Sequence, residues 1–429
     1  MMKRFGDERD WFFERRIGMF VHWGLYAING WHEQEMWRRH VPRAHYVKLA
    51  ERFNPERFDP DQWIDLAESA GMRYMCVTAK HHDGFCLWDT RETAFHVMNT
   101  PYGKDIIGML AEACARRGMP LQLYYSCVDW HHPNYPNQGR HHELSGPQEG
   151  DRPDMAAYMA FVRNQLRELC TNYGTLHGIF WDMNVPGHRD PGLHAMIRHL
   201  QPAAVINDRG YGEGDYGTPE RDYDAAQIAG HRAFDRPTEA CQSLGMTSWG
   251  YRSEEDYYSA KYMMQSMDQI LAMGGNYLLN VGPCADGTIA PEYAAAFGRI
   301  GQWSAKARES WEGAEPASEL LRSPNMLLTR KGTSLYVHLY RDPQGAAIVV
   351  EGLETLPIRA VLLNDGRELP CVRSQGTRHW RQPLEDVRIR GLPIDELAGE
   401  VPVIRLEFDH APALRPQESG EPAPEGLFR

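Results

Sequence analysis

Seven short apolar runs of strand length alternate with stretches of helical periodicity through the first three quarters of this sequence. This alternation is typical of βα units arranged around a parallel sheet, and it favours an α/β barrel one strand short of eight. The runs predicted as strands are Ile17 to Trp23, Arg73 to Ala79, Leu121 to Tyr125, Gly178 to Asp182, Ala204 to Asn207, Ala240 to Leu244 and Tyr277 to Val281.

Three of the intervening helices have clear boundary signals. The first begins after Asp59-Pro60 and ends at Gly71, because proline is favoured in a first helical turn and glycine just past a helix end. The second carries an apolar stripe from Ile106 and closes with two arginines before Gly118, where cations suit the helix dipole. A third is predicted from about Asp154 to Asn172.

The pattern changes after about Glu312, where short β-type runs are separated by Gly, Pro, Asn and Asp. We predict a catalytic barrel over residues 1–312, a smaller C-terminal β-sandwich over 313–411 and a flexible tail over 412–429. The tail is rich in Pro, Glu and Gly and lacks periodic hydrophobicity. The runs predicted as sandwich strands are Ser334 to Tyr340, Ala346 to Val350, Arg359 to Leu363 and Val401 to Phe408.

Charge and composition exclude several kinds of partner. The 46 basic and 58 acidic side chains give a formal net charge of -12, and no stretch is rich in Lys and Arg. We therefore expect no nucleic-acid or membrane partner. Charges interrupt every apolar run between Met1 and Phe20, so no signal peptide is expected and a cytoplasmic location is predicted. The eight cysteines are scattered without a CxxC pair, which indicates neither a disulfide framework nor a zinc site.

Polar and aromatic side chains gather where the predicted strands stop. Active groups of a βα barrel lie at the carboxyl ends of its strands, so these segments are candidates for one shared site. Singly, each has a structural explanation as a core residue or a helix cap, but the repetition favours function. The segments are His22-Trp23-Gly24, Lys80-His81-His82-Asp83-Gly84, Tyr124-Tyr125-Ser126, Trp181-Asp182 and Asn207-Asp208-Arg209, with Asp129-Trp130-His131-His132 just beyond the third strand.

Asp182 is the sharpest candidate. It follows the apolar run Gly178 to Trp181, so its carboxylate is predicted to enter the barrel mouth beside an indole, where it could attack an anomeric carbon. Glycoside hydrolysis also needs a second carboxyl group to protonate the leaving oxygen. A separation of ~5 to 5.5 Å between the two groups gives retention of configuration, and ~6.5 to 9.5 Å gives inversion.

Several motifs together resemble the α-L-fucosidases of glycoside hydrolase family 29. The resemblance extends from about residue 12 to 410 and implies a (β/α)8-like TIM barrel, a C-terminal β-sandwich and hydrolysis of terminal α-L-fucosides by double displacement. The resemblance also implies that the substrate is a fucosylated oligosaccharide or glycoside and that no cofactor or metal is needed. The motifs are Gly18 to Gly24, Phe53-Asn54-Pro55, His81 to Phe85, Asp129 to Pro133, Ser248-Trp249-Gly250-Tyr251 and Gly274 to Pro283.

The resemblance also implies catalytic roles. Asp182 matches the nucleophile that forms the covalent fucosyl-enzyme, in agreement with its position after an apolar strand. The acid/base of the family lies on a variable loop after the Asn-Asp-Arg strand end, and Glu220 of the loop Gly214 to Glu220 is the best match. Glu239 opens a predicted strand and is the competing assignment.

Sugar-binding roles are carried over in the same way. The family often places an adjacent Glu-Trp pair in the loop after the first strand, whereas this chain has Trp31-His32-Glu33-Gln34-Glu35-Met36-Trp37. Glu35 and Trp37 are the expected equivalents, with Glu33 as an open alternative. The resemblance assigns the fucose hydroxyls to His22, His81, His82, Tyr125 and Arg209, and the side near the C5 methyl to Trp181 and Trp249.

Two other functions compete with this hypothesis. A metal-dependent hydrolase could use the pairs His81-His82, His131-His132 and His141-His142 with nearby aspartates. Adjacent histidines on an extended segment point to opposite sides, however, and no HxH or HExxH spacing occurs. A non-catalytic fucose-binding protein on the same scaffold would bind the sugar without turnover, but both expected carboxylates are present.

Overall fold

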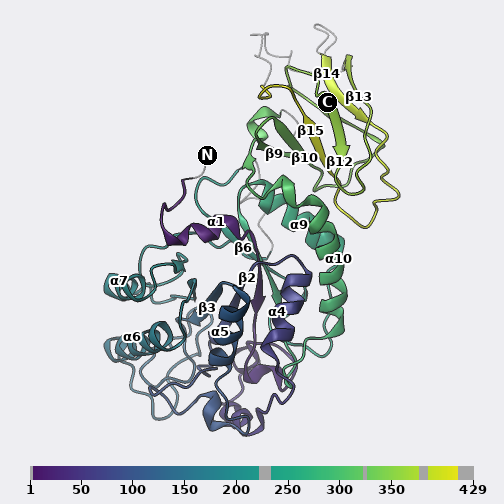
Figure 1. The fold of residues 1–429 in the computed structure, drawn as a ribbon. Helices are drawn as coiled ribbons and strands as arrows, with labels where there is room; N and C mark the ends of the chain where they lie inside the picture. Colours follow the sequence, from purple (N-terminus) through teal and green to yellow (C-terminus); the bar gives the residue numbers. More distant parts are fainter. Residues whose placement is uncertain (1–2, 222–232, 322–325, 376–384, 414–429) are drawn as a thin grey trace, which may run out of the picture. The chain divides into compact units, whose positions relative to one another are not determined.

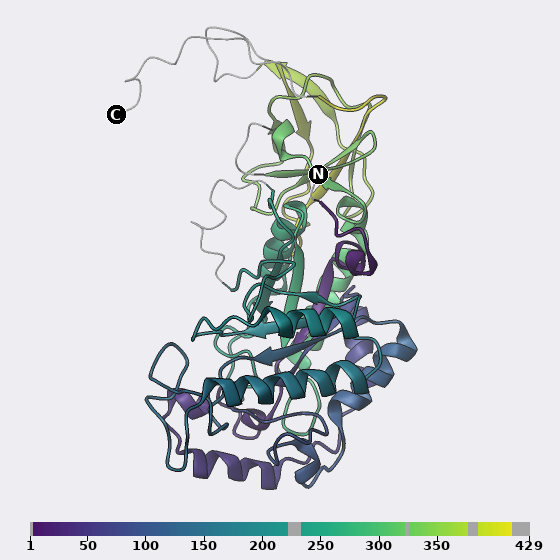
Figure 2. The same cartoon turned by 90° about the vertical axis from the view of Figure 1, so that its left-hand side faces the viewer.

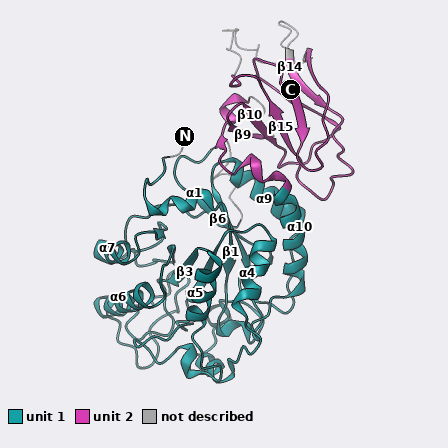
Figure 3. Cartoon of the chain, in the orientation of Figure 1, with its two compact units in different colours: residues 1–305 teal, residues 306–429 magenta. Residues whose placement is uncertain are grey.

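The structure is a computed structural model that describes residues 3–221, 233–321, 326–375 and 385–413. The chain forms two compact units, Met1–Ala305 and Lys306–Arg429 (Figure 3). The sequence pattern placed the change of character later, after Glu312. Of the predicted tail, all but Pro412 and Ala413 lies outside the described residues.

The first unit is built on a curled parallel sheet of seven strands in the order β5-β4-β3-β2-β1-β7-β6 (Figure 1). All seven predicted strands are confirmed. β1 pairs with both β2 and β7. The first and last of these strands in chain order are therefore neighbours in the sheet, as closure of a barrel requires. The strands are β1 (Ile17–Val21), β2 (Tyr74–Lys80), β3 (Leu121–Ser126), β4 (Gly178–Asp182), β5 (Val205–Ile206), β6 (Glu239–Ser243) and β7 (Asn276–Val281).

An extended stretch, residues 216–220, connects the two ends of this sheet. Tyr216 forms a parallel bridge with Asn207 just after β5, whereas Gly217 bridges Thr238 and Glu220 bridges Cys241 of β6. The stretch therefore occupies the place of the strand that the sequence pattern lacked. It was expected to be a loop, and its short, irregular bridging explains why it shows no strand-like apolar run.

Helices cover the outside of the sheet. Figure 1 and Figure 2 show α6 and α7 side by side. The described helices of this unit are α1 (Trp11–Glu14), α2 (Glu35–Arg38), α3 (Arg43–Tyr46), α4 (Pro60–Ser69), α5 (Ile106–Arg117), α6 (Met155–Asn172), α7 (Pro191–Leu200), α9 (Ala260–Ala272) and α10 (Pro291–Ala307), which runs into the second unit. Short 3-10 turns of the first unit are Glu8–Asp10, Leu25–Ala27, Val47–Arg52 and Val97–Asn99, and those of the second unit are Arg308–Ser310 and Ser318–Leu320.

The three helices with boundary signals are confirmed, and each begins at a capping aspartate. Asp59, Asp105 and Asp154 accept hydrogen bonds from backbone N–H groups in the first turns of α4, α5 and α6, which satisfies donors that have no partner within the helix. α5 ends at Gly118, whose φ of 63° is the left-handed conformation that glycine adopts without strain.

Alternate residues of the parallel strands face the inside of the barrel. A buried cluster brings together Phe20, Tyr74, Cys76, Tyr124, Phe180, Cys241 and Leu278 from six different strands. Intervening residues point outward, as Tyr125 does when its hydroxyl donates to Gln165 on α6. This two-residue period decides which side chains reach the barrel mouth.

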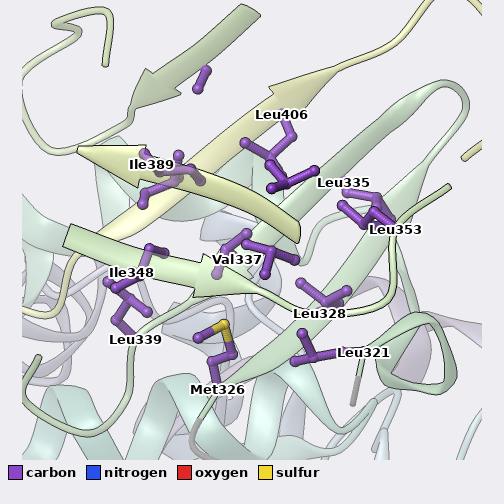
Figure 4. Close-up of a cluster of buried hydrophobic side chains, with 14 of the residues drawn as sticks. Leu321, Met326, Leu328, Leu335, Val337, Leu339, Ile348, Leu353, Ile389 and Leu406 are labelled. Carbon is purple, nitrogen blue, oxygen red and sulfur yellow. The ribbon is translucent and has the colours of Figure 1, made fainter. Parts of the chain in front are cut away.

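The second unit is the predicted β-sandwich, with sheets β12-β15-β10-β9-β8 and β11-β14-β13. Leu328, Val337 and Leu406 of the larger sheet share a buried core with Ile348 and Ile389 of the smaller one (Figure 4). The four predicted runs correspond to β10, β11, β12 and β15. The strands are β8 (Glu315–Pro316), β9 (Leu327–Lys331), β10 (Ser334–His338), β11 (Ala347–Val350), β12 (Arg359–Leu362), β13 (Cys371–Gln375), β14 (Glu385–Arg390) and β15 (Val403–Glu407).

Helices of the length and apolarity needed to cross a bilayer do not occur in the part of the chain that the structure describes.

Two glycines of α10 give a matched test of close helix packing. A Cβ atom at position 301 would lie 1.8 Å from the carbonyl oxygen of Ser69 in α4, whereas one at position 298 meets nothing within 4 Å. We expect Gly301→Ala to destabilise the protein by about 1 to 3 kcal/mol through overpacking. Gly298→Ala should stabilise it by up to ~1 kcal/mol, because alanine favours the helix. Urea unfolding measures both, and equal effects would contradict this packing.

Candidate active site

A cavity of about 150 Å³ opens at the carboxyl ends of the barrel strands. Its size suits a small ligand. Its floor is Phe20, Phe180 and Cys241 of the inward-facing strand positions. The strand ends contribute His22, His81, His82, Tyr124, Asp182 and Arg209, and other segments contribute Glu33, Gln34, His141, His142, Met183, Glu220 and Trp249.

Asp182, the last residue of β4, is held by three neighbours. Its Oδ2 accepts a hydrogen bond of 2.7 Å from the Tyr124 hydroxyl and lies 3.8 Å from Nε2 of His82, and its Oδ1 lies 3.1 Å from Nη1 of Arg209. Burial alone would raise the pKa of Asp182, but the charge of Arg209 and the hydrogen bonds from Tyr124 and Arg209 hold it below its ordinary value. The carboxylate is therefore ionised at neutral pH.

Arg209 connects Asp182 to Glu220. The same Nη1 atom that contacts Asp182 lies 2.8 Å from Oε2 of Glu220, and Nη2 donates to the carbonyl oxygen of Thr218 at 2.6 Å. Arginine can bind several acceptors at once through its planar array of N–H groups. It therefore joins two carboxylates across the mouth, with Glu220 the more exposed of the two.

Three buried histidines line the cavity as neutral rings. Burial lowers the pKa of His22 to about 4 and that of His82 to about 3, and it lowers the pKa of His81 well below the ordinary value. Nδ1 of His22 pairs with Oδ1 of Asn280 at 2.7 Å, and Nδ1 of His82 pairs with the Ser126 hydroxyl at 2.6 Å. A neutral imidazole offers one donor and one acceptor, which suits a hydroxyl group.

Glu33 is the acidic residue that the loop after β1 brings to the cavity. Its Oε2 accepts hydrogen bonds from the Ser248 hydroxyl at 2.7 Å, the Trp249 amide at 2.9 Å and the Gly250 amide at 3.2 Å. Burial, which raises its pKa, is outweighed by His32, Ser248 and His22, so the pKa is lowered and the group is ionised. Glu33 thus places the segment that carries Trp249.

Glu35 and Trp37, the expected sugar contacts of this loop, do not line the cavity. Glu35 binds Asn29 at 2.7 Å and Arg39 at 3.0 Å, and the Trp37 indole donates to the carbonyl oxygen of Glu143 at 2.7 Å. Glu33, the open alternative, lines the cavity together with Gln34. The reason lies in tertiary structure, because Glu33 forms hydrogen bonds with the segment of Trp249, whereas Glu35 binds Asn29 and Arg39.

Tyr125 and Trp181 were also expected at the sugar and point away from it. The Tyr125 hydroxyl donates to Gln165 at 2.7 Å, and the Trp181 ring lies parallel to that of His194. Their neighbours Tyr124 and Phe180 line the cavity instead. The physical cause is the two-residue period of a strand. If Asp182 faces inward, so does Phe180, and Trp181 must face outward.

Glu239, the competing acid/base, is buried inside the barrel and is not a cavity residue. Its Oε2 accepts hydrogen bonds from the Tyr74 hydroxyl at 2.6 Å and from Nε2 of Gln122 at 3.4 Å. Burial raises the pKa of Glu239 to about 7, against these bonds. Of the two carboxyl groups considered, Glu220 is the one in the cavity with Asp182.

The histidine pairs beyond the mouth have partners that disfavour a metal site. His131 stacks on Phe95 and His132 packs on Phe161, while Asp129 forms a 2.8 Å ion pair with the buried Lys80. Across residues 3–413 with their gaps, the described side chains contain no cluster of three or more His, Cys, Asp or Glu arranged to hold a metal ion. Asp129 instead shapes the loop, accepting bonds from the amides of His131 and His132.

The sequence model of the family described as Alpha-L-fucosidase matches residues 5–309. This chain belongs to that family. It is 25% identical over 411 residues to the tissue alpha-L-fucosidase of Rattus norvegicus, an alignment that covers 88% of this chain and 85% of the relative. As a member of the α-L-fucosidase family, the chain is a glycoside hydrolase.

Solved α-L-fucosidase structures share the fold over nearly the whole chain. Alpha-L-fucosidase isoenzyme 1 from Paenibacillus thiaminolyticus has 32% identity and a TM-score of 0.81, covering 94% of this chain and 99% of that one. A trapped covalent intermediate of a family 29 α-L-fucosidase from Bacteroides thetaiotaomicron, in complex with 2-fluoro-fucosyl fluoride, has 26% identity and a TM-score of 0.78. It covers 94% of this chain and 97% of that chain.

The cavity of this α-L-fucosidase also contains residues that were given no catalytic or sugar-binding role from the sequence, although Tyr124 belongs to one of the candidate strand-end segments. Tyr124 and Phe180 could have been found from strand alternation, once Asp182 was placed facing inward. His142 was considered only as a metal ligand, and Gln34 not at all. No local signal distinguishes these last two, because loops far apart in sequence bring them to the cavity.

Glu239 makes the stability of this α-L-fucosidase depend on pH. Its folded-state pKa of about 7 exceeds the ordinary value of 4.5, so its contribution is fully present below about 4.5 and is lost as pH rises through 7. We expect the free energy of unfolding of Glu239→Gln, relative to that of wild type, to be higher at pH 8 than at pH 4.5 by on the order of 2 to 4 kcal/mol. Urea unfolding at both pH values measures this difference.

The exposed Glu254 supplies the control, since Glu254→Gln makes the same carboxylate-to-amide replacement at a position outside the barrel interior. If the difference in unfolding free energy between Glu239→Gln and wild type were the same at both pH values, it would contradict a buried Glu239 that is protonated in the folded state.

Proposed function

We propose that this chain is a retaining exo-α-L-fucosidase that releases terminal α-L-fucosyl residues from oligosaccharides or glycoconjugates. The observation that carries the proposal is the shared contact of Asp182 and Glu220 with Nη1 of Arg209, at 3.1 and 2.8 Å. These distances limit the two carboxylate oxygens to at most about 6 Å apart, near the ~5 to 5.5 Å of retaining enzymes and short of the ~6.5 to 9.5 Å of inverting ones.

In the first step, Asp182 attacks the anomeric carbon and the glycosidic C–O bond breaks, while Glu220 gives its proton to the leaving oxygen. This forms a covalent fucosyl-enzyme with inverted configuration. In the second step, Glu220 takes a proton from water, the water oxygen attacks the same carbon, and the Asp182 carboxylate leaves. The two inversions give net retention. Arg209 supports the cycle by stabilising the ionised form of Asp182.

The shape of the mouth supports removal of a single terminal sugar. Beside the small cavity lies a more open hollow of about 540 Å³, lined in part by Met183, Arg189 and Asp208. The two spaces share Asp182, Met183, Arg209 and Glu220. The bond to be cleaved would therefore lie between them, with the fucose in the cavity and the leaving group in the hollow.

The lining also suits a deoxy sugar. The neutral rings of His22, His81 and His82 offer donors and acceptors for hydroxyls, and a sugar that lacks a matching hydroxyl would leave a buried polar atom unpaired. Phe180 and Trp249 offer an apolar side for the C5 methyl group. Phe180 takes the place that was expected of Trp181.

Replacing each carboxylate tests the mechanism. We expect Asp182→Gly to lower kcat on aryl α-L-fucosides by at least ~10³-fold, because it removes the nucleophile. Azide should restore the rate and give the β-fucosyl azide. Glu220→Gly should lower turnover of natural substrates by ~10² to 10⁴-fold. It should give the α-fucosyl azide, since azide then attacks the β-linked intermediate.

Glu239→Gly is the comparison variant. An inactive Glu239→Gly beside an active Glu220→Gly would overturn the acid/base assignment. NMR of the first product from the wild-type protein should show α-L-fucose before mutarotation, and initial β-L-fucose would overturn the retaining mechanism. Sugar binding without any turnover by the wild type would support the non-catalytic alternative instead.

A further inference from the structure

Three buried polar atoms in the cavity lining have no hydrogen-bond partner within the described part of the chain. They are Oε1 of Glu33, Nδ1 of His81 and Nδ1 of His142. A buried polar atom without a partner costs about 1 to 3 kcal/mol, so such atoms call for a specific explanation. The three residues line one cavity, and a ligand with several hydroxyl groups would supply partners for these atoms. Of the three, the His142 atom has been given no role.

His142 is presented to the cavity by a loop that is fixed on both sides. The carbonyl oxygen of His142 accepts from Nε1 of Trp130, and that of Glu143 accepts from Nε1 of Trp37, both at 2.7 Å. The Trp37 ring also meets the His142 ring edge-on, with centroids 4.9 Å apart. Trp37 does not line the cavity, and it acts on the cavity through its contact with His142.

The buried carboxylate of Glu143 fixes the loop from within. It accepts bonds from the Tyr135 hydroxyl at 2.8 Å, the Gln138 amide at 3.0 Å and the Arg140 side chain at 2.7 Å. His142 itself has a φ of 60°, a left-handed conformation that is costly for residues other than glycine. Surrounding contacts must maintain such strain, and it concentrates at functional positions.

The His142 ring is neutral and lines the same cavity as the acidic groups of Asp182 and Glu33. Burial and the neighbouring His141 lower its pKa to about 4, while Asp182 and Glu33 act in the opposite direction. The ring centroid lies 5.7 Å from that of His82. His142 thus adds a further neutral donor and acceptor beside the nucleophile.

We propose that His142 is a specificity-determining residue, whose Nδ1 atom hydrogen-bonds one hydroxyl of the sugar bound in the cavity. The inference rests on the proposed function for the identity of that sugar as L-fucose. Trp37 and Glu143 are positioning residues that hold His142 against the sugar.

The test compares wild type with His142→Phe, which keeps a ring and removes both nitrogens. Substrates are p-nitrophenyl α-L-fucoside and its 2-, 3- and 4-deoxy analogues. We expect His142→Phe to lower kcat/KM for the parent about 10- to 100-fold, mainly through KM, as loss of one buried hydrogen bond requires. For the analogue that lacks the partner hydroxyl, the two proteins should differ by less than about 3-fold.

A purely structural role for His142 predicts a different result, in which all four substrates lose the same factor. That result, or an unchanged KM for the parent, would overturn the proposal. His142→Gln retains a donor and an acceptor and should recover part of the lost affinity. His199→Phe, at an exposed position on α7, controls for histidine replacement in general. Thermal unfolding of each variant identifies any that fails to fold.

A binding measurement separates this inference from the proposed function. If the wild type hydrolyses none of the fucosides, the proposed function fails. Calorimetric titration with L-fucose then still tests His142, and at least about 10-fold weaker binding to His142→Phe is expected. Equal binding by both proteins, or no binding by the wild type, would overturn the inference.

Discussion

One nitrogen of Arg209 joins the regular and irregular sides of the barrel. It binds Asp182, which ends a regular parallel strand, and Glu220, which lies on the stretch 216–220 between β5 and β6. The second guanidinium nitrogen binds the backbone of that stretch at Thr218. Removing the cation would leave a buried carboxylate unpaired, which is strongly unfavourable. The chemistry of the site thus depends on Arg209, whose contacts also hold the carboxyl groups of Asp182 and Glu220 in place.

The surrounding histidines are neutral, so the charge at this site is confined to Arg209 and the carboxylates that it binds. A protonated His82 would compete with Arg209 for Asp182, and further cations would weaken the basicity of the nucleophile. Burial prevents this by lowering the pKa of His22, His81 and His82. The rings remain donors and acceptors without charge. In the proposed mechanism, sugar recognition and activation of Asp182 can therefore occur in one small cavity without electrostatic interference.

The barrel and its catalytic end were predictable from sequence, because apolar runs mark strands and polar residues at their ends mark the mouth. Asp182, His22 and His81 follow from that logic alone. Applying the two-residue period consistently would also have selected Tyr124 and Phe180. The stretch 216–220 could not be predicted as a barrel element, because isolated bridges replace a strand there and leave no periodic signal.

Loop residues escaped prediction for another physical reason. Glu33 and Glu35 are equivalent in local sequence, and only the segment Ser248 to Gly250, more than 200 positions away, makes Glu33 the cavity residue. Similarly, Trp37 gains its role from the distant backbone of Glu143. The strand ends therefore place Asp182 and the buried histidines His22, His81 and His82, whereas contacts between loops bring Glu33 and His142 to the cavity. Changes in these loops can alter recognition while the pair bridged by Arg209 stays in place.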